Sequence, residues 1–330
     1  MTDTRLDVLA IGDAIVDVIA TADDAFLQEE GLVKGSMQVL DAEGAKRLYA
    51  RMSQARETSG GSAANTMAGV AALGGRAGFV GQVADDQLGE IFSHDIRAHG
   101  VEFRTPPLKG GLPTGRCLIL VTPDAQRTMN TFRGAAHELS AASLDAEQIR
   151  SAAILYLEAY LWRSAGPRAA MEEAMAIAHG AGRKVAFTLS DIACIAPHRA
   201  EMMAMIEAGA IDLLFANENE IRELAATADR DAAVEAIAER VPLVVVTCGE
   251  QGALAVEGGR RVSVPIARIG TGVVDTTGAG DLFAAGFLIG QARGESLEQS
   301  LRIGSVAAAE VISHFGARPE ADLRKLVEAL

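Results

Sequence analysis

One segment of the chain places a carboxylate directly after a run of small residues. It reads DTTGAGD at positions 275–281 and leads into an apolar, helix-like pattern at 282–290. Small residues let backbone N–H groups approach an anion closely, and the positive end of a helix dipole favours a phosphate. The carboxylate of Asp281 could accept the proton of an attacking hydroxyl, so the segment is typical of phosphoryl transfer. A plain strand-to-helix turn would give the same short motif. The residues that could form the anion hole are Gly278, Ala279 and Gly280.

A second glycine-containing segment, SGGSAAN at 59–65, opens a helical pattern that ends at positions 74–75. Gly60 and Gly61 would allow close backbone approach, and Asn65 would offer a polar side chain beside them. A glycine turn capped by Ser62, with the asparagine merely in the first helical turn, explains the same letters.

Two further pairs of polar residues follow apolar runs. Asn217 and Glu220 come three residues apart where a predicted strand passes into a helix, so they could organise a hydrated Mg²⁺ near a triphosphate. They could equally form an N-terminal capping box.

Asp13 and Asp17 follow the first apolar run and could accept hydrogen bonds from the vicinal hydroxyls of a ribose. The alternative is a loop aspartate and an exposed aspartate.

Together these segments resemble the PfkB, or ribokinase-like, family of carbohydrate and nucleoside kinases. Positions 275–287 are similar to its second signature and 59–65 to its first. The resemblance implies that Asp281 is the transfer base and that Asp17 is the sugar-binding acid. Asp13 stands where many members carry Asn or Ser. The resemblance also implies a sugar pocket lined by Gly60, Gly61 and Asn65, and an Asn-x-x-Glu motif at Asn217 and Glu220.

Other implied roles lie outside the signatures. Arg127 resembles the family's lid-hairpin arginine, which reaches the transferring phosphate, and Tyr160 falls where stacking aromatics occur, although a core role is as plausible. Asp275 and Thr277 would help to form a K⁺ site. A turn after the apolar run 243–247 resembles the nucleotide contact of the family and contains Thr247, Gly249 and Gly252.

Several segments resemble the adenosine kinase branch most. The expected reaction is therefore transfer of the γ-phosphoryl group of ATP, with Mg²⁺, to the 5′-hydroxyl of a nucleoside, adenosine first. A PfkB sugar kinase acting on ribose, fructose or a keto-deoxy acid would use the same base. A catalytically silent nucleoside or sugar sensor is a third alternative, which the intact Asp281 disfavours. No Gly-x-x-x-x-Gly-Lys-Ser/Thr string occurs, which excludes a P-loop kinase by motif.

Short apolar runs alternate with helical patterns, which predicts an α/β protein with a mainly parallel, doubly wound sheet. The resemblance implies the ribokinase-like three-layer α/β/α form, one domain over 1–330, with a small β-sheet lid from about 14–40 and 101–133. The predicted core strands are Asp7–Ile11, Ala77–Gln82, Ile154–Glu158, Lys184–Thr188, Asp212–Phe215 and Leu243–Thr247. The predicted helices are Ala63–Leu73, Leu88–His99, Arg168–Ala181, Arg199–Ala208, Glu218–Ala226, Gly280–Ala292 and Leu297–Ser313.

Composition narrows the possible partners. The net charge of −14 argues against nucleic acid as a partner, and the small-molecule substrate is expected to be held by local groups. The three cysteines are too widely spaced for a zinc site. The apolar start of the chain is too short for a signal peptide or membrane span, so a cytoplasmic enzyme is expected, either a monomer or a lid-mediated homodimer.

Overall fold

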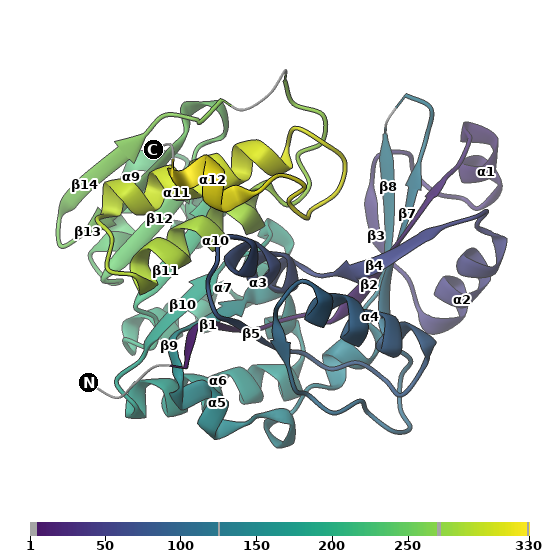
Figure 1. The fold of residues 1–330 in the computed structure, drawn as a ribbon, viewed down its shortest axis with the longest axis horizontal. Coiled ribbons are helices and arrows are strands. Elements are labelled where there is room, and N and C mark those ends of the chain that lie inside the picture. Colours follow the sequence, from purple (N-terminus) through teal and green to yellow (C-terminus); the bar gives the residue numbers. More distant parts are fainter. Residues whose placement is uncertain (1–4, 125, 269–271, 329) are drawn as a thin grey trace.

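The structure is a computed structural model that describes residues 5–124, 126–268, 272–328 and 330. Figure 1 shows a large sheet covered by helices and a smaller sheet standing to one side. Within the described residues the large sheet has nine strands in the order β14-β13-β12-β11-β10-β9-β1-β5-β6. Its strands are β1 (Leu6–Ile11), β5 (Ala77–Val80), β6 (Glu102–Phe103), β9 (Ala152–Glu158), β10 (Lys184–Thr188), β11 (Leu213–Asn217), β12 (Leu243–Thr247), β13 (Ala253–Glu257) and β14 (Arg260–Val264).

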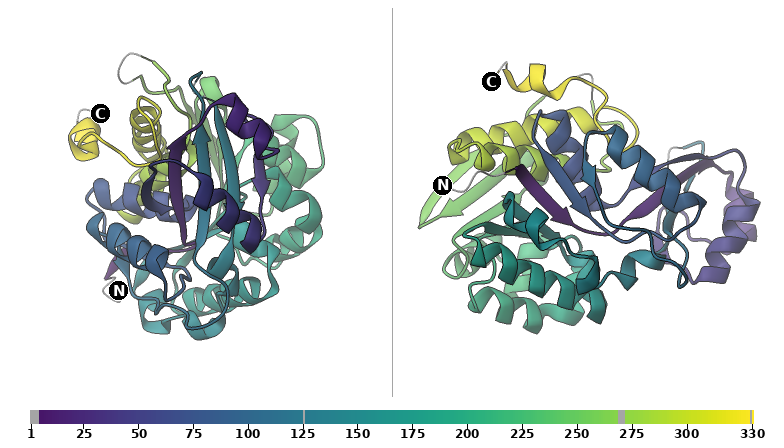
Figure 2. Two further views of the ribbon diagram at one scale, coloured as in Figure 1. Left: turned by 90° about the vertical axis from the view of Figure 1, so that its right-hand side faces the viewer. Right: turned by 60° about the horizontal axis from the view of Figure 1, so that its bottom comes forward.

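The large sheet is parallel from β6 to β12, and the hairpin β13–β14 at one edge is antiparallel. Parallel neighbours require crossover connections, and helices supply them on both faces (Figure 2). One face carries α3 (Ser62–Ala72), α4 (Gln87–Ala98), α10 (Ala279–Ala292), α11 (Leu297–Val311) and α12 (Leu323–Glu328). The other carries α5 (Ala146–Arg150), α6 (Ala165–Gly180), α7 (Ile192–Glu207), α8 (Glu218–Ala225) and α9 (Arg230–Ala238).

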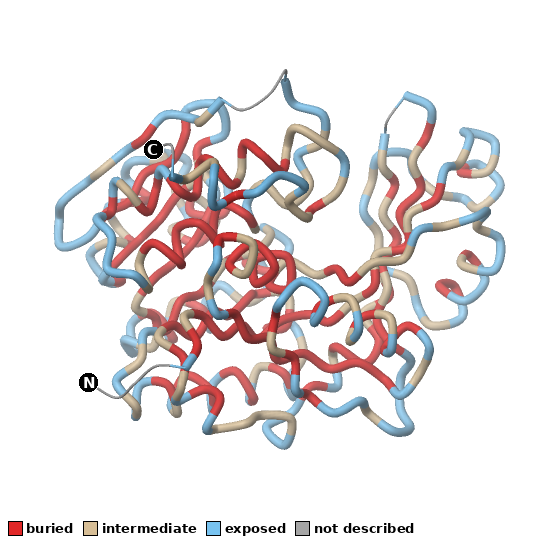
Figure 3. The backbone as a smooth tube through the Cα atoms, in the orientation of Figure 1, coloured by how far each residue is buried: buried red, intermediate tan, exposed pale blue. Residues whose placement is uncertain are grey.

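The two faces of the sheet form two separate hydrophobic cores. In β1, Val8 and Ala10 belong to one core, whereas Leu9 and Ile11 belong to the other, because successive side chains of a strand point to opposite faces. The buried stretches therefore run through the centre of the body in Figure 3. These features confirm the predicted three-layer α/β/α fold. None of the helices in the described ranges has the length and apolar character needed to cross a membrane.

The small sheet has the strand order β3-β8-β7-β2-β4 and mixes parallel and antiparallel pairs. Along β2, Val16 and Val18 are buried in a core that also includes Leu27 and Leu48, whereas Ile15 and Asp17 face the opposite side. The two faces are therefore distinct: α1 (Asp24–Glu29) and α2 (Ala42–Arg51) cover one, and the other faces the large sheet (Figure 1). The strands are β2 (Ile15–Thr21), β3 (Met37–Val39), β4 (Arg56–Gly60), β7 (Gly115–Val121) and β8 (Arg127–Phe132).

Most of the predicted elements are present, and two differences have clear causes. The six predicted core strands are all found, with ends within two residues of those expected. The helix predicted from Arg199 begins at Ile192 instead, because Asp191 caps it and the chain stays helical through Pro197. Strand β4 was not predicted, since its sequence RETSG has no apolar side chain to signal a strand.

Candidate active site

The carboxyl ends of the parallel strands and the inner face of the small sheet enclose a cavity of about 590 Å³. Ligands of doubly wound sheets bind at this edge of the sheet. The predicted site residues that line the cavity are Asp13, Asp17, Gly61, Asn65, Tyr160, Asn217, Glu220, Thr247, Thr277, Gly278, Gly280 and Asp281. Those outside its lining are Gly60, Arg127, Gly249, Gly252, Asp275 and Ala279.

Helix α10 begins at the cavity with free backbone donors. Its N-cap, Gly278, has a φ of 79° and provides no side-chain cap. The N–H of Ala279 donates to the carbonyl oxygen of Thr276 at 3.2 Å, whereas the N–H of Gly280 has no backbone or side-chain acceptor within the described residues and is left for another acceptor. A β-carbon at Gly280 would meet no atom within 4 Å, so the space beside this glycine is open. The start of α10 can therefore hold an anion.

Asp281 lies in the first turn of α10 and is held by two residues of α3. One carboxylate oxygen accepts a hydrogen bond from Ser62 Oγ at 2.6 Å and the other from Asn65 Nδ2 at 2.9 Å. Burial raises the pKa of Asp281, and the two hydrogen bonds and the charge of Arg318 oppose that rise. The two signature segments thus meet at one carboxylate, which can accept a proton beside the anion-binding helix end.

The glycines before α3 are required by close contacts. Gly61 has a φ of 99°, and a β-carbon there would overlap the carbonyl oxygen of Asp13. A β-carbon at Gly60 would overlap the carboxylate of Asp17. Gly60 therefore makes room for the acidic residue instead of lining the cavity itself.

Glu158, at the end of β9, was not among the predicted site residues. One of its carboxylate oxygens accepts a hydrogen bond from the backbone N–H of Asp13 at 2.6 Å, and the other accepts one from that of Ala63 at 2.7 Å. The side chain is fully buried, and this burial, followed by the nearby Asp13, raises its pKa well above the usual value. Glu158 ties the loop after β1 to the start of α3.

Asp13 and Asp17 present carboxylates to the same cavity. Asp13 is buried, and its Oδ1 accepts no hydrogen bond within the described residues; His137 Nε2 lies 3.5 Å from it. Asp17 lies on the inner face of β2, and burial raises its pKa to about 6. An unpaired carboxylate oxygen in a polar cavity is available to accept hydrogen bonds from substrate hydroxyls.

Asn217 and Glu220 form the capping box at the start of α8, and both also line the cavity. Asn217 Oδ1 accepts from the N–H of Glu220 at 2.9 Å, and the Glu220 carboxylate accepts from the N–H of Asn217 at 2.9 Å. Burial raises the pKa of Glu220 to about 7. Their oxygen atoms suit a hydrated Mg²⁺, so the pair fits this ion in chemical type while capping the helix.

Arg127 reaches from β8 to the segment that precedes α10. Its guanidinium forms an ion pair with Asp275 Oδ2 at 2.6 Å and donates to Thr277 Oγ1 at 2.6 Å. Asp275 also accepts hydrogen bonds from the N–H groups of Thr277 and Gly316. The hairpin arginine thus contacts the start of the anion hole although it does not line the cavity.

Arg318 is a second residue that the sequence prediction missed. Its guanidinium donates to the carbonyl oxygens of Ala64 at 2.7 Å and Ser59 at 2.8 Å, on either side of the paired glycines. Burial lowers its pKa to about 10, against the opposing charges of Asp95, Asp17 and Asp281. Nothing in the local sequence around position 318 marks this role, because its partners lie more than 250 residues away.

Some of the remaining predicted residues line the cavity, and others stabilise the backbone near it. Tyr160, in the short helix η3 (Ala159–Arg163), lines the cavity and donates to the carbonyl of Ser190 at 3.4 Å. Thr247 lines it at the end of β12. The following turn contains Gly249 and Gly252; the latter has a φ of 91°, and a β-carbon there would overlap the carbonyl oxygen of Val264. Gly252 is therefore needed for the close packing of this turn.

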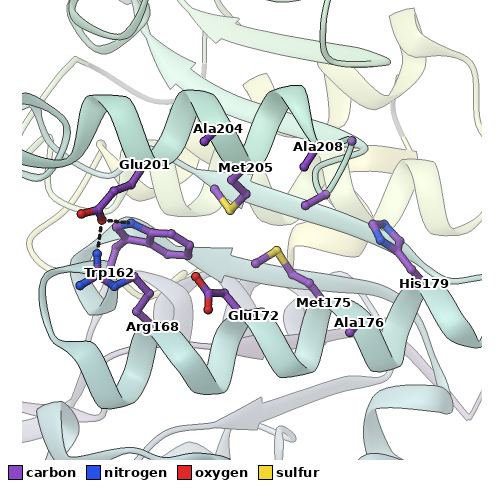
Figure 4. A pocket seen from close by; sticks show the side chains of 12 residues that line it. Trp162, Arg168, Glu172, Met175, Ala176, His179, Glu201, Ala204, Met205 and Ala208 are labelled. Carbon is purple, nitrogen blue, oxygen red and sulfur yellow. Dashed lines mark hydrogen bonds and ion pairs between the residues drawn. The ribbon is translucent and has the colours of Figure 1, made fainter.

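A second hollow, of about 680 Å³, lies between α6 and α7 and is lined by none of the predicted residues (Figure 4). Trp162, Met175 and Met205 form its apolar lining. The ends are charged but paired: Glu201 contacts Arg168 and accepts from Trp162 Nε1 at 3.2 Å. His179, at the other end, contacts Asp212 at 2.9 Å.

Comparison with known proteins places the chain in a class. The family model described as pfkB family carbohydrate kinase matches residues 6–323. The chain belongs to this family, and the predicted resemblance is confirmed. Its fold and relatives make it a phosphotransferase that acts on a hydroxyl group.

Individual relatives differ in their substrates. A solved structure of adenosine kinase from Sinorhizobium meliloti is 48% identical, with a TM-score of 0.91, and the match covers 98% of this chain and 99% of that one. The 5-dehydro-2-deoxygluconokinase of Shouchella clausii is 30% identical over 77% of this chain and 80% of its own length. The adenosine kinase of Saccharomyces cerevisiae is 26% identical over 93% of this chain and 95% of its own. Both nucleoside and sugar kinases are therefore among the relatives.

Proposed function

We propose that this protein transfers the γ-phosphoryl group of ATP to the 5′-hydroxyl of a nucleoside, with adenosine as the first acceptor to test. The observation that carries the proposal is the position of Asp281, in the first turn of α10 beside the open start of that helix, with its carboxylate held by Ser62 and Asn65. The relative from S. meliloti, titled adenosine kinase, supports the choice of acceptor because it is similar over nearly the whole chain.

The chain's own groups divide the work of the transfer. The carboxylate of Asp281 accepts the proton of the attacking hydroxyl as the new O–P bond forms and the bond between the γ-phosphorus and the departing ADP breaks. The backbone N–H groups of Gly278 and Gly280 stabilise negative charge on the transferring group. The N–H of Ala279, which the sequence also assigned to the anion hole, would have to leave the carbonyl oxygen of Thr276 to take part. Asp13 and Asp17 accept hydrogen bonds from the ribose hydroxyls and so position the 5′-hydroxyl.

Other residues hold the donor and close the site. Asn217 and Glu220 would hold a hydrated Mg²⁺, which supplies charge neutralisation at the phosphates when bound. Thr247, with the turn containing Gly249 and Gly252, would contact the nucleotide. Arg127 brings a cation to the start of the anion hole from the small sheet, which would act as a lid.

Dependence on K⁺ through Asp275 and Thr277 stays a prediction. Arg127 already occupies both side chains, so a monovalent cation would compete with the guanidinium for the same carboxylate. A cytoplasmic location and a monomeric or lid-paired state also stay predictions.

One observation favours a second candidate. The relative named 5-dehydro-2-deoxygluconokinase is 30% identical, so a sugar kinase with the same base and a different acceptor is the alternative. The test is product formation with Mg·ATP across adenosine, inosine, guanosine, ribose, fructose and 2-keto-3-deoxygluconate, with Asp281→Asn as the control. Asp281-dependent formation of AMP supports the proposal. If only a free sugar were phosphorylated, the nucleoside would be rejected as the acceptor, and the assignment as a kinase would be kept.

A further inference from the structure

Two arginine side chains line the cavity and have no hydrogen-bond or ion-pair partner among the residues that the structure describes. Arg133 follows β8 and Arg163 ends η3, and both belong to the cavity lining. Within the described part of the chain, neither guanidinium donates a hydrogen bond or forms an ion pair. In contrast, Arg127 forms an ion pair and a hydrogen bond, and Arg318 donates hydrogen bonds to Ala64 and Ser59. Burial, and then the charge of the neighbouring Arg163, lowers the pKa of Arg133, so the two cations lie near each other.

The order of strands assigns this pair to the side of the cavity that holds the acceptor. Arg163 follows β9, and β9 lies directly beside β1, which leads to Asp13. The proposed donor-side residues, Asn217 and Thr247, stand at the ends of β11 and β12, beyond β10. Arg163 therefore lies on the β1 side of β10, away from the proposed nucleotide side. The charges of Arg163 and Asp13 both act on Arg133, which follows β8 and lines the same cavity, so Arg133 lies with them.

Unpaired guanidinium groups in a substrate cavity favour ligands with particular hydrogen-bonding groups. Each is a planar fork of N–H donors that accepts nothing, so it binds groups that present acceptors only, such as a carboxylate or an O6/N7 purine edge. Adenine is a poorer match at that edge, because its 6-amino group is a donor next to N7. The Asp13 carboxylate influences the pKa of Arg133 but forms no ion pair with it, so both guanidiniums have donors left for a ligand.

We propose that Arg133 and Arg163 form the specificity site for an acceptor-only group on the substrate, other than its phosphorylated hydroxyl. This inference rests on the proposed kinase function and deepens it. Two sources share the chemistry: the 6-oxo edge of a purine nucleoside such as inosine, and the carboxylate of a sugar acid such as 2-keto-3-deoxygluconate. In the source that the protein uses, the acceptor-only molecule is expected to be preferred over its counterpart: inosine over adenosine if the acceptor is a nucleoside, and the sugar acid over the neutral sugar if it is not.

The experiment measures kcat/KM with Mg·ATP for two matched pairs, inosine against adenosine and 2-keto-3-deoxygluconate against fructose. The variants are Arg133→Gln and Arg163→Gln, each with a charge-retaining Arg→Lys partner. The control is Arg260→Gln, which removes an exposed arginine from β14, at the far edge of the large sheet. Thermal unfolding midpoints of all variants establish that they fold.

The result expected is a preference for the acceptor-only member of one pair that falls about 10- to 100-fold in Arg133→Gln and Arg163→Gln, as loss of a charged hydrogen bond predicts. The lysine variants should retain part of this preference, and Arg260→Gln should leave the preference unchanged. The pair that shows the effect identifies the source. If turnover depends on Asp281 but the ratio of kcat/KM values within each pair is the same in both glutamine variants as in the wild type, this inference is overturned. The proposed kinase function is then unaffected. Absence of turnover on every acceptor would overturn the proposed function and this inference together.

Discussion

Arg127 and Asp275 form an ion pair at 2.6 Å that joins the small sheet to the segment leading into the anion hole. The two residues lie 148 positions apart in sequence, and both side chains are largely buried. Because the same guanidinium donates to Thr277, the hairpin β7–β8 and the start of α10 are held together at one point. The small sheet is thereby joined directly to the segment that leads into the proposed anion hole.

Replacing Arg127 with Gln should lower kcat about 100-fold or more, because an arginine near a transferring phosphoryl group offsets its charge. The KM for the acceptor should change less, since Arg127 does not line the cavity. A double-mutant cycle with Asp275→Asn tests the link: the two losses should be clearly less than additive. Fully additive losses would contradict a shared role for the pair.

Replacing Asp281 with Asn should lower kcat about 1000-fold while the dissociation constant of the acceptor changes by less than about threefold. The asparagine keeps the shape and one hydrogen-bond acceptor for Ser62 or Asn65, but it cannot take the proton. Rapid-quench turnover and calorimetric binding separate the two effects. Retention of more than a tenth of the wild-type kcat would remove Asp281 from the role of base.

Much of the fold was predictable because its signals are local. Each βα unit is indicated in the sequence by a short apolar run followed by a 3.6-residue pattern. Strand β4 was not predictable in this way. Its polar side chains carry no strand pattern, and the antiparallel pairing with β2 that makes it a strand is formed by backbone groups.

Part of the candidate site could be predicted because its residues lie in short sequence motifs. The start of α10, the paired glycines and the Asn-x-x-Glu pair could be located because they resemble motifs of the PfkB family, although only the structure brings Asn65 to Asp281. Glu158 and Arg318 carry no such signal. Their partners are backbone groups between 95 and 259 residues away, so a sequence shows a charged residue but not what it binds.

Binding of the acceptor should weaken as the pH falls through about 6. Asp17 has a pKa near 6 in the folded protein because of its burial, and a protonated carboxyl loses part of its capacity to accept hydrogen bonds from hydroxyls. The affinity measured by calorimetry should drop up to about tenfold per pH unit below this value. The Asp17→Asn variant should bind weakly with little pH dependence. An unchanged pH profile in that variant would assign the titration to another group.

The same substitution should stabilise the ligand-free protein at alkaline pH. The pKa of Asp17 is about 6 in the folded state against an ordinary value of 3.8, so between these values the folded state binds more protons than the unfolded state. Stability from this group is therefore lost as the pH rises from about 4 to about 6. Asp17→Asn should raise the unfolding midpoint by about 2 °C or more at pH 8 and by little at pH 4. A lower midpoint at pH 8 would show that the charged form is well compensated in the folded protein.

Replacing Glu158 with Gln should weaken binding of the acceptor without changing Asp281, the proposed base. In the wild type, both carboxylate oxygens accept backbone N–H groups, one from Asp13 and one from Ala63. A glutamine has one carbonyl oxygen, so its amide nitrogen must face one of these donors, and a buried N–H is left without an acceptor. The loop carrying Asp13 and the start of α3 should then separate, which raises the KM of the acceptor about tenfold or more. The KM of Mg·ATP should stay close to its wild-type value, because Asn217 and Thr247 lie on other strands. A merely structural residue would lower the unfolding midpoint and leave the ratio of the two KM values unchanged; that outcome would remove Glu158 from the role of a positioning residue.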